Sequence, residues 1–94
     1  MENTENNMLK TRDLSVLGYA NGFTLWHFVT DDPASALQTT GYFNEAADMF
    51  RPGDLILANV QRTPSEIASL FLSVARIDQG DVALGTIAQS EIDE

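Results

Sequence analysis

Residues 23–30 constrain the fold of this 94-residue chain more than any other segment. They follow Asn21-Gly22, the strongest short-range turn signal, and they are rich in aromatic and β-branched side chains, so a β-strand is predicted. Alternation places Leu25 on one face of this strand and Trp26 on the other, and both faces carry large apolar groups. A strand of this kind lies in the centre of a sheet or at a contact between subunits.

Residues 55–61 form a second predicted strand that is also apolar on both faces. A chain reversal at residues 51–54 precedes it. Pro52 fixes φ at the first turn position, and Gly53 supplies the positive φ of a type II turn.

Only one helix is expected, between these two strands. Apolar residues at helical spacing predict at most two turns over residues 44–50, with Asn44 as the N-cap and Glu45 in the first turn. Residues 34–41, which precede the helix, form a connector of small and polar residues.

Residues 66–78 fit two structures, because their apolar side chains fall at helical spacing while residues 70–77 also fit a strand. The segments that follow favour the strand. Residues 78–81 form a tight turn that contains a glycine, and residues 82–87 are another short β-like run. A terminal hairpin is therefore predicted.

Short strands separated by Gly, Pro, Asn and Asp turns predict a mainly β fold with one short helix, as a small antiparallel β-sandwich or barrel. Residues 1–15 are polar and form an arm that either stays mobile or orders on a neighbour. Residues 16–90 form the β-rich assembly domain, and residues 91–94 form a polar tail.

The small size of this domain predicts that partner subunits complete it. A domain of this length buries only about 60% of the surface that its unfolded chain exposes. The chain has no cysteine, which excludes disulfides, and its single histidine excludes an imidazole-rich metal site within one chain. Its 44% hydrophobic content supplies side chains for a core and for an interface. We therefore expect an oligomer.

The charge of the chain excludes two classes of partner. Fourteen acidic residues against five basic ones give a net charge of -9, which repels nucleic-acid phosphates and anionic lipid surfaces. The first residues lack the basic and apolar regions of a signal peptide, and no run of about twenty apolar residues could span a membrane. We expect no nucleic acid, no membrane and a cytoplasm-like site of synthesis.

Residues that could catalyse a reaction are few. His27, the only imidazole, lies within a predicted strand and is expected to be a packed or interface residue. The acidic pairs Asp31-Asp32 and Asp78 with Asp81 lie in turns, where solvated side chains are expected in preference to acid–base catalysis or a Ca²⁺ site. The glycines match no phosphate-binding pattern. We expect no enzymatic activity, no cofactor and no metal.

His27 allows one conditional hypothesis. If it lies at a subunit contact, its protonation at mildly acid pH would weaken assembly. Particle integrity that does not change in a His27→Gln variant between mildly acid and neutral pH would contradict this hypothesis.

Aromatic residues offer one further possibility. Trp26, Phe28, Tyr42, Phe43 and Phe50 could stack on a base or a sugar. Basic residues are not interleaved with them, so core packing is the favoured interpretation.

From Gly22 onward the chain contains GFTLWHFVTDD and then GYFNEAADMFRPGDLILANV. This two-part pattern resembles that of small bacteriophage virion proteins. In these, a Gly-Phe-x-Leu-Trp-aromatic strand is followed by Tyr-Phe-x-x-Ala-x-Asp-Met and by a Gly-Asp turn that leads into an apolar strand. The resemblance covers residues 19–60, and residues 66–76 depart from it by being more helix-like. It implies a β-rich, generally trimeric protein, either a capsid decoration (cement) protein or a domain of a head or tail fibre.

The leading hypothesis is a capsid decoration protein, a homotrimer that binds the outer surface of a phage head and bridges subunits of the major capsid protein. It would be made in the bacterial host cytoplasm and located on the virion. The residues expected in the trimer interface or core are Leu25, Trp26, Phe28, Leu55, Leu57 and Phe71. The residues expected to contact the capsid are Met8, Leu9, Lys10 and Arg12.

Two other hypotheses stay open. The first is a tail-tip or fibre-attachment protein that contacts a receptor through the aromatic residues. The second is a small acidic inhibitor of a host enzyme.

Overall fold

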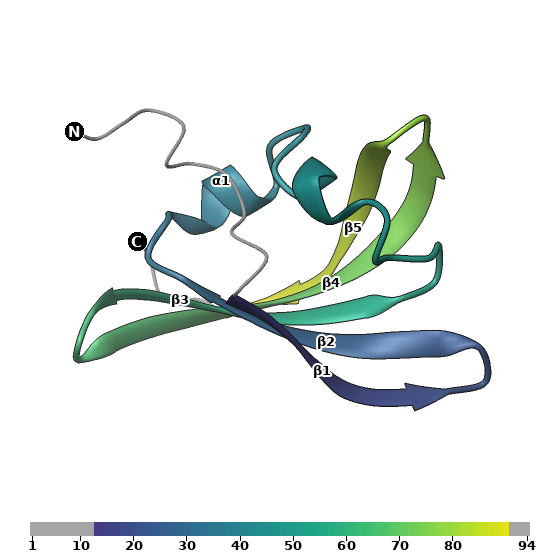
Figure 1. Cartoon of the computed structure of the whole chain (residues 1–94). Helices are drawn as coiled ribbons and strands as arrows, with labels where there is room; N and C mark the ends of the chain where they lie inside the picture. The colour runs from purple at the N-terminus through teal and green to yellow at the C-terminus, as the bar shows by residue number, and fades with distance from the viewer. Residues whose placement is uncertain (1–12, 91–94) are drawn as a thin grey trace.

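Five strands lie side by side in the order of the chain, β1-β2-β3-β4-β5 (Figure 1). The computed structural model describes residues 13–90. The strands are β1 (Leu14–Ala20), β2 (Phe23–Thr30), β3 (Leu55–Thr63), β4 (Glu66–Asp78) and β5 (Asp81–Gln89). β2 and β3 are parallel, and the other neighbouring pairs are antiparallel.

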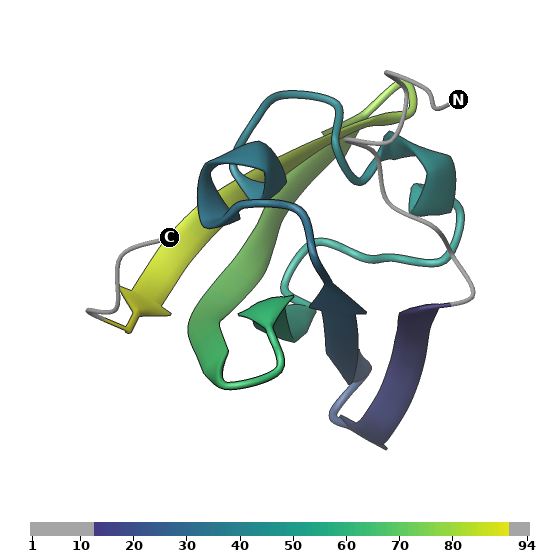
Figure 2. The ribbon, with the colours of Figure 1, turned by 90° about the vertical axis from the view of Figure 1, so that its left-hand side faces the viewer.

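The parallel pair exists because a long crossover, residues 31–54, returns the chain to the end of the sheet at which β2 begins. The crossover contains the short helix α1 (Ala34–Leu37) and the 3₁₀-helix η3 (Asn44–Ala46). Both helical segments lie on the same side of the sheet in two views a quarter turn apart (Figures 1 and 2). The crossover therefore covers one side of the sheet.

The core lies between the crossover and this covered side. Alternate residues of β2, β3 and β4 point toward the crossover, which meets them with buried rings. Trp26 and Phe50 pack edge to face with centroids 5.4 Å apart, and Phe28 packs in the same way on Phe43, also at 5.4 Å. The buried apolar residues are Leu14, Trp26, Phe28, Ala34, Ala36, Leu37, Tyr42, Phe43, Ala46, Phe50, Ile56, Ala58, Val60, Ala68, Leu70, Leu72, Val74 and Val82.

One carboxylate, Asp54, is buried beside this core. Its side chain accepts hydrogen bonds from the backbone N–H of Thr24 at 2.9 Å, from the Trp26 indole N–H at 3.1 Å and from the backbone N–H of Arg51 at 3.0 Å. These three donors belong to β2 and to the end of the crossover. Asp54 therefore connects the start of β3 to both segments.

The reversal before β3 has the predicted geometry. The Asp54 N–H donates to the Arg51 carbonyl at 3.0 Å, and Gly53 has φ of 100°. A Cβ atom on Gly53 would lie 2.5 Å from the Phe23 ring, so the site needs glycine for its backbone conformation and for the close approach of the ring.

Both edge strands contain an additional residue. Leu17 is the extra residue of β1, because the pairing with β2 shifts between Val16 and Gly18. Ile87 is the extra residue of β5, because Phe71 pairs with Ala88 while Leu72 pairs with Thr86. Each is a β-bulge on the outermost strand of its side.

The mainly β class and the small helical content are confirmed. The strand at residues 23–30 has the predicted bounds, and residues 66–78 form a strand despite their helical spacing. The expectation of an antiparallel sheet is wrong, because β2 and β3 are parallel. The described residues form one sheet, and a second sheet that would complete a sandwich is not among residues 13–90.

The local predictions in the crossover are wrong in two respects. Instead of a helix over residues 44–50, only η3 forms, and Asn44 does not cap it. The Asn44 side chain instead donates to an Asp81 carboxylate oxygen at 2.9 Å and accepts the Val82 N–H at 2.9 Å. The crossover is thereby attached to the β4–β5 hairpin. Residues 34–37, expected to be a connector, form α1.

Leu14 lies in β1 and is buried, so the folded part begins before the expected boundary at residue 16.

Candidate functional site

The side of the sheet opposite the crossover carries the candidate site, which we call the open face. It consists of the outward-pointing residues Phe23, Leu25, His27, Val29, Leu55, Leu57, Asn59, Ile67, Ser69, Phe71 and Ser73. These residues alternate along β2, β3 and β4 with the buried residues of the core. No described segment packs over them in the way that the crossover packs over the other side (Figure 2).

Apolar side chains fill the centre of the open face. Leu25 pairs with Leu55 across the β2–β3 ladder, and Leu57 pairs with Phe71 across the β3–β4 ladder. Leu57 is 37% exposed. Large apolar side chains that adjoin one another in water mark an interaction surface more often than an ordinary protein surface.

Acidic residues avoid this part of the sheet. β2 and β3 contain no Asp or Glu, and β4 carries them only at its two ends, Glu66 and Asp78. The chain as a whole has a net charge of -9. Depletion of charge at the centre of an apolar patch is typical of the buried core of a protein interface.

A short polar chain crosses the open face beside the apolar centre. The Asn59 amide N–H donates to the Ser69 hydroxyl at 2.9 Å, which leaves its carbonyl oxygen to accept a hydrogen bond from His27 Nε2 at 2.7 Å. This network assigns the proton to Nε2. Asn59 stands between the imidazole and the hydroxyl, so His27 does not act as a base on Ser69 in this arrangement.

Two apolar hollows lie at opposite sides of the open face. One, of about 390 Å³, is lined by residues of β1, β2 and the start of β3, and Tyr19 and Phe23 are among them. The other, of about 320 Å³, is lined by residues of β3, β4 and β5, with Leu57, Phe71 and Ala88 among them. The two hollows share no residue.

The six residues predicted for the trimer interface or core divide between the two sides of the sheet. Leu25, Leu55, Leu57 and Phe71 come together on the open face. Trp26 and Phe28 point the other way, into the core. The predicted capsid contacts, Met8, Leu9, Lys10 and Arg12, and the predicted tail at residues 91–94 lie outside the described residues.

The aromatic residues considered for stacking on a ligand are buried. Trp26, Phe28, Tyr42, Phe43 and Phe50 are each at most 5% exposed, which confirms core packing. They are therefore not available to contact a receptor.

One of the acidic turn residues, Asp32, forms a hydrogen bond within the crossover. Asp32 accepts a hydrogen bond from the Tyr42 hydroxyl at 2.7 Å. Burial raises the pKa of the Tyr42 hydroxyl well above its ordinary value, and the Asp32 carboxylate raises it further because a second negative charge there would be repelled.

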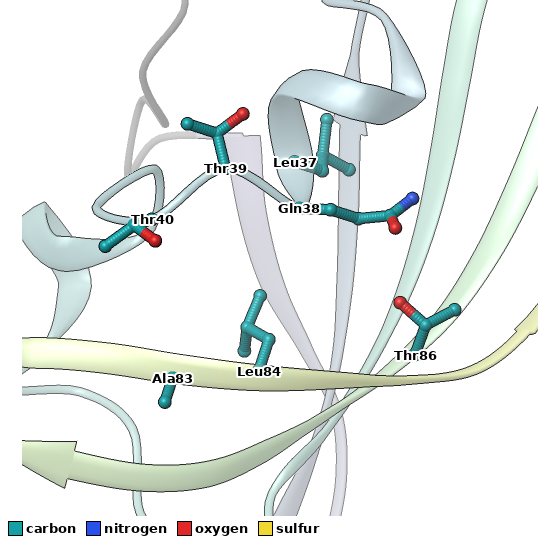
Figure 3. A pocket seen from close by; sticks show the side chains of 7 residues that line it. All are labelled: Leu37, Gln38, Thr39, Thr40, Ala83, Leu84 and Thr86. Atoms are coloured by element: carbon teal, nitrogen blue, oxygen red, sulfur yellow. The ribbon is translucent and has the colours of Figure 1, made fainter.

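A third hollow, of about 280 Å³, lies on the covered side between the end of α1 and β5. Leu84 rises from β5 toward the loop that carries Gln38, Thr39 and Thr40 (Figure 3). The Gln38 amide also donates to Gln89 at 3.3 Å. The lining contains hydroxyls, one amide and aliphatic groups but no ionisable side chain, so it offers little for specific recognition.

Several residues of the open face were not singled out by sequence reasoning. Val29 is 40% exposed and Ile67 is 45% exposed, and Asn59 and Ser69 form the polar chain. The alternation of residues along each strand predicts which side chains share a face, so these residues could have been assigned to the open face once it was known which face the crossover covers.

No helix in the described part of the chain has the length and apolar character needed to cross a membrane. Within residues 13–90, no three Asp, Glu or His side chains lie close enough to hold a metal ion. Comparison of the chain with protein-family models, with curated proteins and with solved structures gave no match.

Proposed function

We propose that this chain is a structural protein of a virus particle, a capsid decoration protein that works as a homotrimer and catalyses no reaction. Its copies associate through the open face and bind the major capsid protein on the outer surface of a phage head. The single observation that supports association is the uncovered, uncharged apolar side of the sheet.

The physical reason for association is the water-exposed area of this side. Burial of apolar surface stabilises by about 25 cal/mol per Å². A domain this small gains little from its own core and benefits from a neighbour that covers its second side. The exposed acidic residues among residues 13–90, which lie at strand ends and in the crossover, then stay in solvent and keep the assembly soluble.

The location on a phage head is supported by the resemblance to small virion proteins described above. The residues that carry the resemblance include parts of both sides of the sheet. Trp26 packs in the core, Gly53 and Asp54 form the turn before β3, and Leu25 lies on the open face.

Light scattering of the purified protein after gel filtration tests association. The expected mass is three times the chain mass of 10.3 kDa. A Leu57→Asp variant is expected to be a monomer, because it places a charge in the centre of the open face. Met49→Asp is the matched control, because Met49 is a similarly exposed apolar residue of the crossover, and it is expected to keep the trimer.

A wild-type protein that is monomeric at all concentrations would contradict the proposal. Circular dichroism spectra of both variants check that the fold is retained. If Leu57→Asp unfolds the chain, Val29→Asp provides a second test on the same face, at a more peripheral exposed position.

Location is tested with phage particles that lack this protein. Purified protein is expected to bind the heads until the sites are full, and gold-labelled protein is expected on the outer head surface by electron microscopy. Labelling confined to the tail would overturn the decoration role without affecting the trimer.

A further inference from the structure

We infer that Asn21 is a modification site, at which the side-chain amide is hydrolysed without an enzyme and the chain is converted in part to isoaspartate. The inference is independent of the proposed assembly, because it concerns one turn of a single chain. It depends on the backbone of the turn, on the access of water to it and on the contacts of the Asn21 amide.

Asn21 and Gly22 form the two-residue loop of the β1–β2 hairpin, because Ala20 pairs with Phe23. Their φ angles are 58° and 84°, as a type I′ turn requires. Asn21 is exposed, and the turn lies at the outer edge of the molecule, on the right of Figure 1. Water therefore reaches the Asn21 amide and the adjoining peptide group.

Gly22 removes the usual steric obstacle to the reaction. Deamidation starts when the backbone nitrogen of the following residue attacks the side-chain carbonyl carbon of asparagine, and a side chain on that residue hinders the approach. Gly22 has no side chain, and a Cβ atom there would meet nothing within 4 Å, so no described segment packs against the turn. The Gly22 N–H donates to no backbone carbonyl among residues 13–90. The reacting atoms can therefore approach when the tip of the hairpin opens, and exposed tips open at the lowest cost in free energy.

The other two asparagines of the described chain are held by hydrogen bonds. The Asn44 amide donates to Asp81 and its oxygen accepts a backbone N–H, both at 2.9 Å. The Asn59 amide donates to Ser69 at 2.9 Å, and Asn59 lies within β3, which is paired on both sides. Among residues 13–90, the Asn21 amide has no bond of this kind. Reaction is therefore expected at Asn21 in preference to the other two.

The reaction consumes one water and releases one ammonia, with no change of oxidation state. The Gly22 nitrogen loses its proton to hydroxide and forms a bond to Asn21 Cγ. The bond from Cγ to the amide nitrogen breaks, and this nitrogen takes a proton from water and leaves as ammonia. Water then opens the cyclic imide. Attack at Cγ gives aspartate, and attack at the main-chain carbonyl carbon gives isoaspartate, in which the main chain runs through Cβ and Cγ.

Isoaspartate changes the hairpin because it adds an atom to the main chain of a two-residue loop. The length of such a loop sets the register of the two strands. Thr24, in the second pair from the turn, donates its N–H to the buried Asp54 carboxylate at 2.9 Å. Isoaspartate at position 21 is therefore expected to disturb this hydrogen bond. Either product also adds a negative charge at the rim of the apolar hollow on the β1–β2 side.

Peptide mass spectrometry of protein incubated at mildly alkaline pH tests the site. Trypsin cuts after Arg12 and Arg62 but not before Pro52, so the peptide of residues 13–62 contains Asn21, Asn44 and Asn59 together. Conversion at Asn21 is expected to be faster than at the other two by about tenfold or more, because their hydrogen bonds must break first. An isoaspartate-specific methyltransferase with a labelled methyl donor is expected to label the incubated protein. Asn21→Gly, which keeps a turn of two residues with positive φ and has no amide at position 21, is expected to stay unlabelled.

The same incubation in guanidinium chloride provides the reference for the unfolded chain. Complete conversion of Asn21 there, with none in the folded protein over the same time, would overturn the inference by showing that the folded turn protects the amide. Equal conversion at all three asparagines of the folded protein would overturn it as well. The isoaspartate form, separated by ion exchange, is expected to melt at a lower temperature than Asn21→Asp, which carries the same charge on an ordinary main chain. Equal melting temperatures would overturn the effect on the hairpin.

Discussion

Replacing Asp54 with asparagine keeps the size of the side chain but replaces one of its two acceptor oxygens with an NH₂ group. In the better orientation, the remaining oxygen keeps the two hydrogen bonds to Trp26 and Arg51, and the new NH₂ group faces the Thr24 N–H. One buried hydrogen bond is lost, its donor has no acceptor, and the other two bonds lose the charge on their acceptor. The alternative orientation loses two bonds.

The cost follows from these changes. An unsatisfied buried donor costs about 1–3 kcal/mol, and bonds to a charged acceptor exceed neutral ones by about 1 kcal/mol each. Relief of the desolvation of the carboxylate offsets part of this. We expect a loss of about 3 kcal/mol, which corresponds to a fall in Tm of roughly 12–24 °C for a domain of this size.

Thermal unfolding followed by circular dichroism measures the effect, and Trp26 fluorescence reports directly on the altered contact because the chain has one tryptophan. Asp48→Asn is the matched control. It makes the same change at an exposed position of the crossover and is expected to stay within about 0.5 kcal/mol of the wild type. All proteins are compared at one concentration, since association makes Tm depend on concentration. An Asp54→Asn protein that melts with the control would refute the structural role assigned to this carboxylate.

Three further changes test other parts of the structure. Burial raises the pKa of the Tyr42 hydroxyl above its unfolded value of about 10, so the contribution of this group to stability is fully present below pH 10 and is lost as the pH rises above that value. In urea titrations at a series of pH values, the free energy of unfolding of Tyr42→Phe should therefore fall less above about pH 10 than that of the wild type. Asn44→Ala removes both bonds to the β4–β5 hairpin and should lower the free energy of unfolding by about 1–3 kcal/mol in a urea titration, and an unchanged value would mean that the hairpin does not need this attachment. Gly53→Ala should lower Tm more than Gly80→Ala, because both glycines have positive φ but only at Gly53 does a Cβ meet a ring; equal losses would show that Phe23 moves aside freely.

The strands could be predicted from the sequence where a single physical signal dominated. Residues 23–30 combine a turn signal with β-branched and aromatic side chains, and the strand has the expected bounds. Residues 66–78 carried conflicting signals, and the hairpin turn at residues 78–81 decided between them correctly. Strand β1 was not predicted, because the extra residue Leu17 and the neighbouring Gly18 break the alternation by which a strand is recognised.

Strand direction and the crossover could not be obtained in this way. Side chains alternate between the two faces with a period of two residues in both parallel and antiparallel strands, so this alternation did not reveal that β2 and β3 are parallel. The apolar residues of segment 43–50 are spaced in the sequence as they are in a helix, but this spacing arises because Phe43 and Phe50 insert into the core. Asn44 was expected to cap that helix, yet its side chain bonds a distant hairpin, which only the tertiary fold brings near.

Part of the candidate site could be predicted from the apolar residues on both faces of the strands. Leu25, Leu55, Leu57 and Phe71 belong to strands with two apolar faces, and all four lie on the open face. Trp26 belongs to the same kind of strand but lies on the covered side, because the sequence does not say which face the crossover will cover. Asp54 looked like an ordinary turn residue, since its three donors come from other segments.

The bulges at Leu17 and Ile87 limit how an assembly of such chains can grow. The unpaired backbone N–H and C=O groups of an edge strand can pair with a further strand only where the edge strand is regular. In β1 and β5 a β-bulge interrupts this regular pattern. Edge-to-edge addition, the route by which exposed sheets polymerise into fibrils, is thereby discouraged on both flanks. In the assembly proposed above, copies would instead meet through their open faces, and this contact ends once each apolar surface is occupied, so that growth would stop at a small closed set.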